Sequence, residues 1–221
     1  MKIEYLGHSC FCLTTESGKK IITDPYQGVG YSLPDGLSAD IVTVSHEHFD
    51  HNAVNCLQSL TSVVKESGTH SIDGITFEGL STWHDDKQGK LRGKNTVYII
   101  KADGLAVAHL GDLGEENNLA LIQSLKGIDI LLIPVGGTYT ITAEQAKRYI
   151  EQISPKLAVP MHYLPNDGTL DIAKADAFLS LFEGVTYATE EGILLDKDVF
   201  TREKTQIIFM ERGRKIWVKK K

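Results

Sequence analysis

Short runs of β-branched, aliphatic and aromatic residues dominate the first half of the chain, and each run ends near a Gly, Asp, Asn or Pro. Such runs, bounded by turn-forming residues, are typical of β-strands. The pattern therefore predicts strands at residues 2–5, 10–14, 20–23, 41–44, 62–65, 75–80, 96–101 and 105–109.

Helical periodicity is clearer in the second half of the chain. It predicts helices over residues 115–126, 142–153 and 169–182. Thr142 is the expected N-cap of the second helix, with Glu144 in its first turn. The residues expected to share one apolar face are Leu119, Ile122 and Leu125 in the first helix, and Ala143, Ala146, Tyr149 and Ile150 in the second.

Three continuous apolar runs lie between and after these helices, at 128–134, 157–160 and 185–188, and predict strands buried on both faces. Strands and helices that alternate in this way predict an α/β fold, in which two packed sheets are covered by helices. We expect one domain over residues 1–221. The runs 206–210 and 215–219 flank Glu-Arg-Gly-Arg and predict a terminal β-hairpin within 205–221.

Length and net charge exclude some classes of function. The chain has 221 residues and a formal net charge of −6. A chain of this length buries roughly 70% of its unfolded surface, so we expect any metal to serve chemistry rather than folding. The negative charge argues against a main task of gripping nucleic-acid phosphates or anionic lipid. We interpret the basic segment 211–221 as a solvated edge strand rather than an anion-binding arm.

The three cysteines are Cys10, Cys12 and Cys56, and they lack the paired spacing of a disulfide framework or a zinc ribbon. This usage predicts a reducing, cytoplasmic setting. The chain also has no signal-peptide-like run near Met1 and no stretch of about 20 apolar residues. Cys10 and Cys12 share a strand face, where apolar packing is a better interpretation than a soft-metal site.

The main chemical feature is Ser45-His-Glu-His-Phe-Asp-His51, directly after the predicted strand 41–44. Imidazoles and carboxylates of this kind bind zinc, manganese or iron. His46 and His48 alternate and can converge on one metal, whereas Asp50 and His51 point to a second. The spacing therefore predicts two adjacent metals rather than an ordinary polar loop.

Three further candidate ligands follow predicted strands elsewhere in the chain. His84 ends Ser-Thr-Trp-His, Asp112 lies in His-Leu-Gly-Asp, and His162 lies in Val-Pro-Met-His-Tyr. A strand end can aim a side chain into a shared cleft on a rigid scaffold. Together with the cluster at 46–51, these residues complete a plausible two-metal ligand set.

These motifs resemble the metallo-β-lactamase superfamily over nearly the whole chain. The matching elements are Leu6-Gly-His-Ser-Cys-Phe11, Thr23-Asp-Pro25, the cluster at 46–51, His84, Gly111-Asp112 and Pro160-Met-His-Tyr163. Further matches at 92–96, 109–114 and 134–140 resemble the branch of small metal-dependent hydrolases akin to L-ascorbate-6-phosphate lactonase and N-acyl-phosphatidylethanolamine phospholipase D.

The resemblance implies a four-layer αβ/βα sandwich with a two-metal cleft at one edge. It assigns His46, His48 and His84 to the first metal, Asp50, His51 and His162 to the second, and Asp112 to a bridge between them. The two divalent ions would be zinc first, with manganese or iron as alternatives. A water or hydroxide between them would be the nucleophile.

Several other residues take expected roles around this cleft. Asp50 could also orient the attacking water or accept its proton. Asp24 is expected to support the 46–51 loop, and His109 to be a supporting or core histidine. His8 could contact substrate, deliver a proton or make a structural hydrogen bond. The substrate-binding candidates are Arg92, Gly137, Tyr139 and Tyr163, with 136–140 serving either as an anion site or as a turn before the helix. His70 carries no signal and is expected in a polar turn.

The resulting expectation is a dinuclear metal-dependent hydrolase that attacks a small ester, lactone or phosphodiester, with a substrate that could be anionic. One alternative is a nuclease or RNA-processing phosphodiesterase, against which the acidic body counts. Another is a metal-binding or ligand-binding protein without catalysis. We expect no stable nucleic-acid or membrane partner, and the pattern does not define the oligomeric state.

Overall fold

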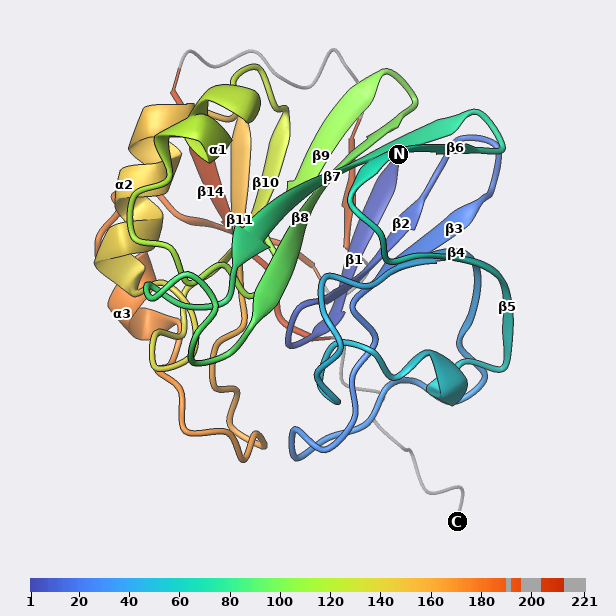
Figure 1. Ribbon diagram of the computed structural model, residues 1–221, viewed down its shortest axis with the longest axis horizontal. Coiled ribbons are helices and arrows are strands. Elements are labelled where there is room, and N and C mark those ends of the chain that lie inside the picture. The colour runs from blue at the N-terminus through green and yellow to red at the C-terminus, as the bar shows by residue number, and fades with distance from the viewer. Residues whose placement is uncertain (190–191, 196–203, 213–221) are drawn as a thin grey trace.

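Two β-sheets stacked face to face form the centre of the protein (Figure 1). The computed structural model describes residues 1–189, 192–195 and 204–212. The first sheet contains, in spatial order, β13 (Ile193–Leu194), β1 (Lys2–Gly7), β2 (Cys10–Thr14), β3 (Lys20–Thr23), β4 (Ser38–Thr43) and β5 (Ser59–Val64). The second contains β12 (Thr186–Tyr187), β14 (Gln206–Phe209), β11 (Leu157–Met161), β10 (Ile130–Pro134), β9 (Leu105–His109), β8 (Lys94–Ala102), β7 (Ile75–Trp83) and β6 (Gly68–Ile72).

The first sheet is apolar on both faces, because successive side chains of a strand point to opposite sides. Phe11 and Leu13 of β2 face the main core between the sheets. Cys10 and Cys12 face a smaller core on the outer side, together with Val54 of the 3₁₀ helix η1 (Val54–Cys56). Both thiols are free and buried, which confirms that they serve in packing.

Helices cover the outer face of the second sheet (Figure 1). They are α1 (Leu119–Ser124), α2 (Ala143–Ile153) and α3 (Asp176–Leu179). Thr142 caps α2 in a capping box with Gln145, as its sequence predicts, and the expected face of α2 is buried. The strands β10 and β11 are buried along their whole length between helices and core. The predicted α/β sandwich is therefore confirmed.

No helix in the described ranges is long and apolar enough to cross a membrane.

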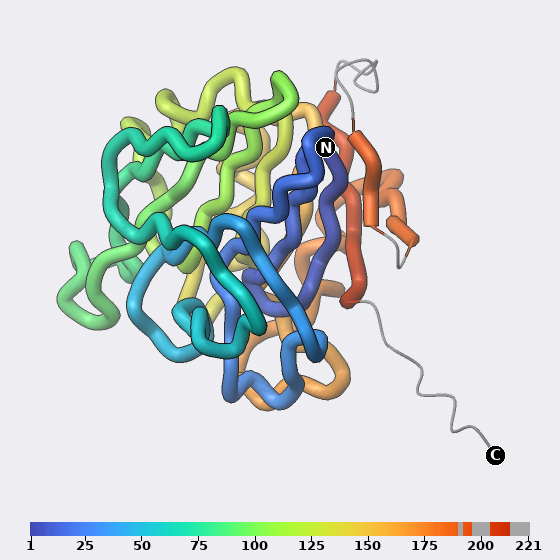
Figure 2. The backbone as a smooth tube through the Cα atoms, turned by 90° about the vertical axis from the view of Figure 1, so that its right-hand side faces the viewer, coloured from blue at the N-terminus to red at the C-terminus, as the bar shows by residue number. Residues whose placement is uncertain are grey.

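The strands that precede the candidate ligands all have their carboxyl ends at one edge of the sandwich. In the first sheet, β1 and β3 are each antiparallel to β2, and β4 is parallel to β3, so β1, β3 and β4 run in one direction. In the second sheet β7, β9 and β11 also share a direction. The loops that follow these strands meet at this edge. For example, the Thr169 N–H donates to the carbonyl of Val29. Figure 2 shows these blue and orange loops together at the lower end of the molecule.

Four details differ from the expected elements. The helix predicted at 169–182 is reduced to α3, because residues before it bond to other loops, as in the Ala173 N–H donation to Gly136. The run 185–188 forms only β12, whose two residues are exposed at the edge of the sheet. His70 lies in β6 rather than in a turn. Leu119 is exposed, and α1 buries Leu121 and Ile122 instead.

The predicted terminal hairpin lies only partly within the described residues. Its first strand is β14, which pairs in parallel with β11 and β12 inside the second sheet. Its second strand, 215–219, and most of the basic segment lie outside the described residues. The hairpin and the single domain over 1–221 therefore stay predictions.

The two-sided burial of the second sheet predicts a large stability effect at Leu132, which is fully buried in β10. Leu132→Ala should lower the free energy of unfolding by about 3 kcal/mol, because the lost side chain leaves a cavity. The control is Leu119→Ala, at a position 66% exposed on α1, which should change stability by less than about 0.5 kcal/mol. Urea unfolding followed by circular dichroism measures both. Equal losses would contradict this account of the core.

Candidate metal centre

The structure brings all seven predicted metal ligands together at the shared edge. Six of the seven fall in two groups, within each of which the ligand atoms lie within 4.8 Å of one another, and His46 and His51 form a third such group with Asp24. The first group is His46, His48 and His84, and the second group is His8, Asp50, His51 and His162. His8 in the second group and Asp24 in the third were not predicted as ligands.

Asp112 lies between the two groups. Its Oδ1 is 3.2 Å from Nε2 of His51, and its Oδ2 is 3.2 Å from Nε2 of both His84 and His162. One carboxylate therefore contacts a histidine of the first group and two of the second. This is the position that a bridging ligand requires, and it is where the sequence places Asp112.

Two glycines allow the Asp112 loop to approach its neighbours closely. Gly111 has a positive φ of 53°, and a Cβ there would lie 2.6 Å from the Cβ of Ser45. A Cβ on Gly114 would lie 2.4 Å from the backbone of His84. Any larger residue at either position would push the loop away from the two neighbouring ligand loops. The Asp112 N–H also donates to Oδ1 of buried Asn95, at 2.9 Å, and this hydrogen bond fixes the loop to β8.

Asp24 organises the 46–51 loop through three hydrogen bonds. It accepts from the Ser45 N–H at 2.8 Å, from the Ser45 hydroxyl at 2.5 Å and from Nδ1 of His51 at 2.8 Å. The Ser45 hydroxyl proton points to Asp24, so its oxygen is free to accept from Nδ1 of His46, at 2.8 Å. The support predicted for Asp24 is present. Ser45 extends it, and sequence reasoning missed this role because the direction of a hydroxyl depends on neighbours distant in the chain.

This network leaves lone pairs aimed at the cluster. If Nδ1 of His46 and His51 carry their protons toward Ser45 and Asp24, the neutral rings hold lone pairs on Nε2. Both Nε2 atoms are buried without a hydrogen-bond partner among the described residues, as is Oδ1 of Asp112. Clustered buried acceptors with no donor are costly unless a cation lies among them. The residues present therefore fit a metal site.

The electrostatics agree with this fit. Burial lowers the pKa of His46 to about 2, so the ring is neutral near pH 7, which is the form that binds metals. Burial would also lower the pKa of His51, but Asp112 and Asp24 raise it well above its usual value, so a bound cation would replace the proton on Nε2 of this ring. Burial would raise the pKa of Asp112, but His162 and His51 hold it well below the ordinary range. The carboxylates of Asp24 and Asp112 therefore stabilise positive charge in the space between them.

His8 supports Asp50. Its Nε2 lies 3.2 Å from Oδ2 of Asp50, and burial lowers the pKa of His8 to about 4. His8, Asp24 and His162 all have positive φ angles, which non-glycine residues rarely adopt. Backbone strain of this kind concentrates at functional sites, where the surrounding structure maintains it.

His109 is a structural neighbour of the cluster rather than a member. Its Nε2 lies 2.7 Å from the carbonyl of Ser9, and its Nδ1 accepts from the Gly111 N–H at 3.2 Å. With both ring nitrogens engaged, it links the β1–β2 turn to the loop of Asp112. This placement agrees with the supporting role expected for it.

Two substrate-binding candidates contact each other beside the first group. The guanidinium of Arg92 lies 5.4 Å from the ring centre of Tyr139 and donates to the carbonyl of Thr138. Buried Asp85 shapes the loop that carries Arg92, because its carboxylate accepts four backbone N–H groups, including that of Arg92. Arg92 also lines a pocket of about 460 Å³, called the basic pocket below, which His46 and His48 border.

The segment 136–140 is a turn with its amides engaged. The Gly137 N–H donates to the carbonyl of Ile141, and the N–H groups of Tyr139 and Thr140 both donate to the carbonyl of Gly137. Of the two expectations for this segment, the structure favours the turn before the helix. An anion site on these amides would need the turn to open.

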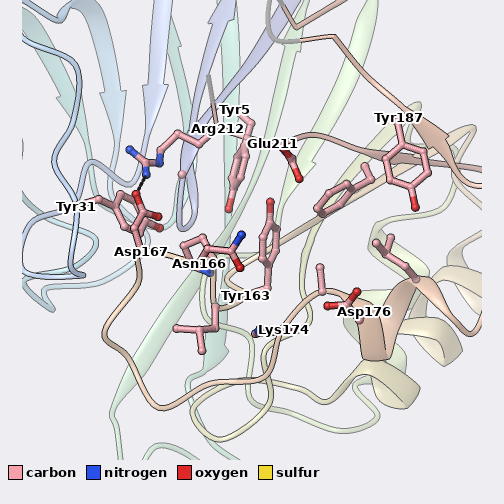
Figure 3. A pocket seen from close by; sticks show the side chains of 16 residues that line it. Tyr5, Tyr31, Tyr163, Asn166, Asp167, Lys174, Asp176, Tyr187, Glu211 and Arg212 are labelled. Carbon is pink, nitrogen blue, oxygen red and sulfur yellow. Dashed lines mark hydrogen bonds and ion pairs between the residues drawn. The ribbon is translucent and has the colours of Figure 1, made fainter. Parts of the chain in front are cut away.

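Tyr163 does not line the basic pocket. It lines a separate cavity of about 500 Å³, where its side chain stands near those of Tyr5 and Glu211 (Figure 3). Its ring centre is 5.9 Å from that of Tyr5, and its hydroxyl donates to the carbonyl of Met210. Tyr163 therefore does not line the basic pocket with Arg92, but it also borders a small hollow together with His8, and its expected contact with substrate stays a prediction.

The Asp24–Ser45 network generates a test of metal affinity. Ser45→Ala should weaken zinc binding by about tenfold or more, because Nδ1 of His46 loses the acceptor that fixes its tautomer. Competition with a chelator measures the affinity. The control is Ser9→Ala, since the Ser9 hydroxyl is also buried beside the site but makes no hydrogen bond among the described residues. Equal affinities for both variants would contradict the network.

Comparison with known proteins agrees with this geometry. The chain is 31% identical over 202 residues to a UPF0173 metal-dependent hydrolase of Thermoplasma volcanium, with 80% of this chain and 87% of the relative covered. It is 33% identical over 186 residues to a UPF0173 metal-dependent hydrolase of Methanoculleus marisnigri, with 74% and 81% covered.

Solved structures share the fold. A protein of Thermotoga maritima, named as a Zn-dependent hydrolase of the metallo-β-lactamase superfamily, superposes with a TM-score of 0.76 at 33% identity, covering 95% of this chain and 99% of that one. An isothiocyanate hydrolase from Delia radicum gut bacteria has a TM-score of 0.68 at 17% identity, covering 97% and 98%, which shows the fold alone. The family model for the beta-lactamase superfamily domain matches residues 2–162. The chain therefore belongs to the metallo-β-lactamase superfamily and is a metal-dependent hydrolase.

Proposed function

We propose that the protein is a dinuclear hydrolase, with one divalent ion in each ligand group and Asp112 between them. The observation that carries this proposal is the placement of a single buried carboxylate 3.2 Å from histidines of both groups. In this assignment His46, His48 and His84 hold the first ion, and Asp50, His51 and His162 hold the second. Zinc is the proposed metal, since the Thermotoga maritima relative is named as Zn-dependent.

When bound, two such ions lower the pKa of water and polarise a carbonyl or phosphoryl oxygen. The chain's own residues prepare the site for this. Asp24 and Ser45 hold His46 and His51 in the ligating tautomer. Asp50, oriented by His8, is placed to accept a proton from an attacking water. No serine or cysteine nucleophile is needed.

The proposed substrate is a small molecule with an ester, lactone or phosphodiester bond. The acidic chain supports a small-molecule substrate over a nucleic acid, because a protein that grips phosphate backbones needs a broad basic surface. Since unrelated chemistries share this fold, the superfamily alone does not choose among the three bonds. A panel of lactones, carboxyl esters and phosphodiesters chooses by direct assay.

Metal content and turnover together test the dinuclear assignment. Protein purified without added metal should contain about two zinc ions per chain by elemental analysis. Asp112→Ala should lower both metal content and hydrolysis, the latter by about a hundredfold or more, because it removes the ligand common to both groups. Asp35→Ala, at an exposed carboxylate, is the control and should change neither. Less than one ion per chain, or full activity without Asp112, would overturn the proposal.

Variants of the separate groups test the assignment of ligands. His84→Ala removes a ligand from the first group only, and His162→Ala removes one from the second group only. Each variant should keep about one metal ion per chain, because the other group remains complete. Titration with zinc, read by elemental analysis after gel filtration, gives the stoichiometry. Loss of all metal from both variants would indicate one shared site instead of two.

A further inference from the structure

The basic pocket opens directly beside the first ligand group. The segment 44–48, which includes His46 and His48, forms part of its wall, and the remainder comes from residues 65–67 after β5, from Ser81 of β7, from Arg92 and from the start of β8. Its volume of about 460 Å³ falls in the range of small-molecule sites. A substrate whose scissile bond lies at the metals would therefore extend naturally into this space.

Most residues that line the basic pocket have polar side chains. Ser67, Ser81 and Thr96 contribute hydroxyl groups, and Val44 is the one aliphatic side chain among its described lining residues. A pocket for an acyl chain or an aromatic ring would need mainly apolar walls. This lining suits a small polar molecule instead.

The strand register explains how Lys94 comes to line the pocket. Ser81 of β7 pairs directly with Thr96 of β8, and Lys94 lies two residues before Thr96 on the same face. Asn95, between them, points to the interior, where its amide donates to the carbonyl of Leu110. One hairpin therefore supports the Asp112 loop on its inner face and presents Lys94 on its outer face.

Three cationic and two anionic side chains line the basic pocket: Lys65, Arg92, Lys94, Glu47 and Glu66. Lys65 pairs with Glu47 at 3.5 Å, and Arg92 is engaged by Thr138 and Tyr139. Lys94 makes no side-chain hydrogen bond or ion pair within the part of the chain that the structure describes. It is a cation without a partner in a pocket of positive balance, on a chain whose formal charge is −6.

We propose that the basic pocket binds an anionic oxygen group of the substrate, a phosphate or a carboxylate, with Lys94 as its main contact. The proposal rests on the proposed function and narrows the substrate to a small hydrophilic molecule that carries an anionic group apart from the bond that is cleaved. Lys94 acts here on specificity, since the ammonium would contact the anionic group and not the reacting atoms.

Calorimetric titration of the zinc-loaded protein with inorganic phosphate tests this proposal without measuring turnover. Lys94→Gln should weaken phosphate binding about fivefold, because an exposed ion pair is lost. Glu66→Gln should strengthen it about twofold, because a repelling carboxylate is removed. Lys90→Gln is the control, at an exposed lysine of the neighbouring loop that does not line the pocket, and it should leave the affinity unchanged. A parallel titration with acetate shows whether a carboxylate is preferred to a phosphate.

Unchanged affinity in Lys94→Gln would overturn the proposal, since phosphate would then bind through the metals alone. An equal loss in Lys90→Gln would overturn it as well, because the effect would be one of overall charge. Absence of any phosphate or acetate binding has the same consequence. A Lys94-dependent affinity without hydrolysis of any panel substrate would retain the pocket and reject the proposed function, so the two failures are distinguishable.

Discussion

The buried carboxylate of Asp24 is the interaction on which the metal centre depends. Burial alone would raise its pKa, but His109 and His51 lower it below the usual value, so it stays ionised inside the protein. As an anion with no proton to donate, it requires its partners to donate to it. That requirement sets the proton on His51 directly and the proton on His46 through Ser45. The ligating face of both rings follows from one buried carboxylate beside them.

The sandwich makes this arrangement possible because the strands that precede the candidate ligands, in both sheets, end at the same edge. His8, Asp24 and the 46–51 loop follow β1, β3 and β4, and the remaining ligands follow β7, β9 and β11. Residues separated by more than 100 positions, such as His51 and His162, therefore meet, with ring centres 5.8 Å apart. The glycines beside Asp112 let its loop fill the narrow space between the two sheets. Core packing thus contributes to the site as well as to stability.

The same β7–β8 hairpin connects metal binding to substrate choice. Its inner face holds Asn95 under the Asp112 loop, and its outer face presents Lys94 to the basic pocket. An acidic chain is a poor general attractor for anions, but a local positive pocket beside bound cations can select an anionic substrate. This combination accounts for a hydrolase whose overall charge and proposed substrate have the same sign.

The sequence by itself determined most of the strands, the superfamily and the candidate metal ligands, because alternating apolar runs and short His- and Asp-containing motifs are local properties. It could not place Ser45, since the direction of a hydroxyl depends on Asp24, 21 residues earlier. It also did not predict the cavity that Tyr163 lines after the left-handed backbone at His162. Nor did it predict the basic pocket. Only the tertiary structure decided these features, because each depends on sheet register and on contacts between segments far apart in the chain.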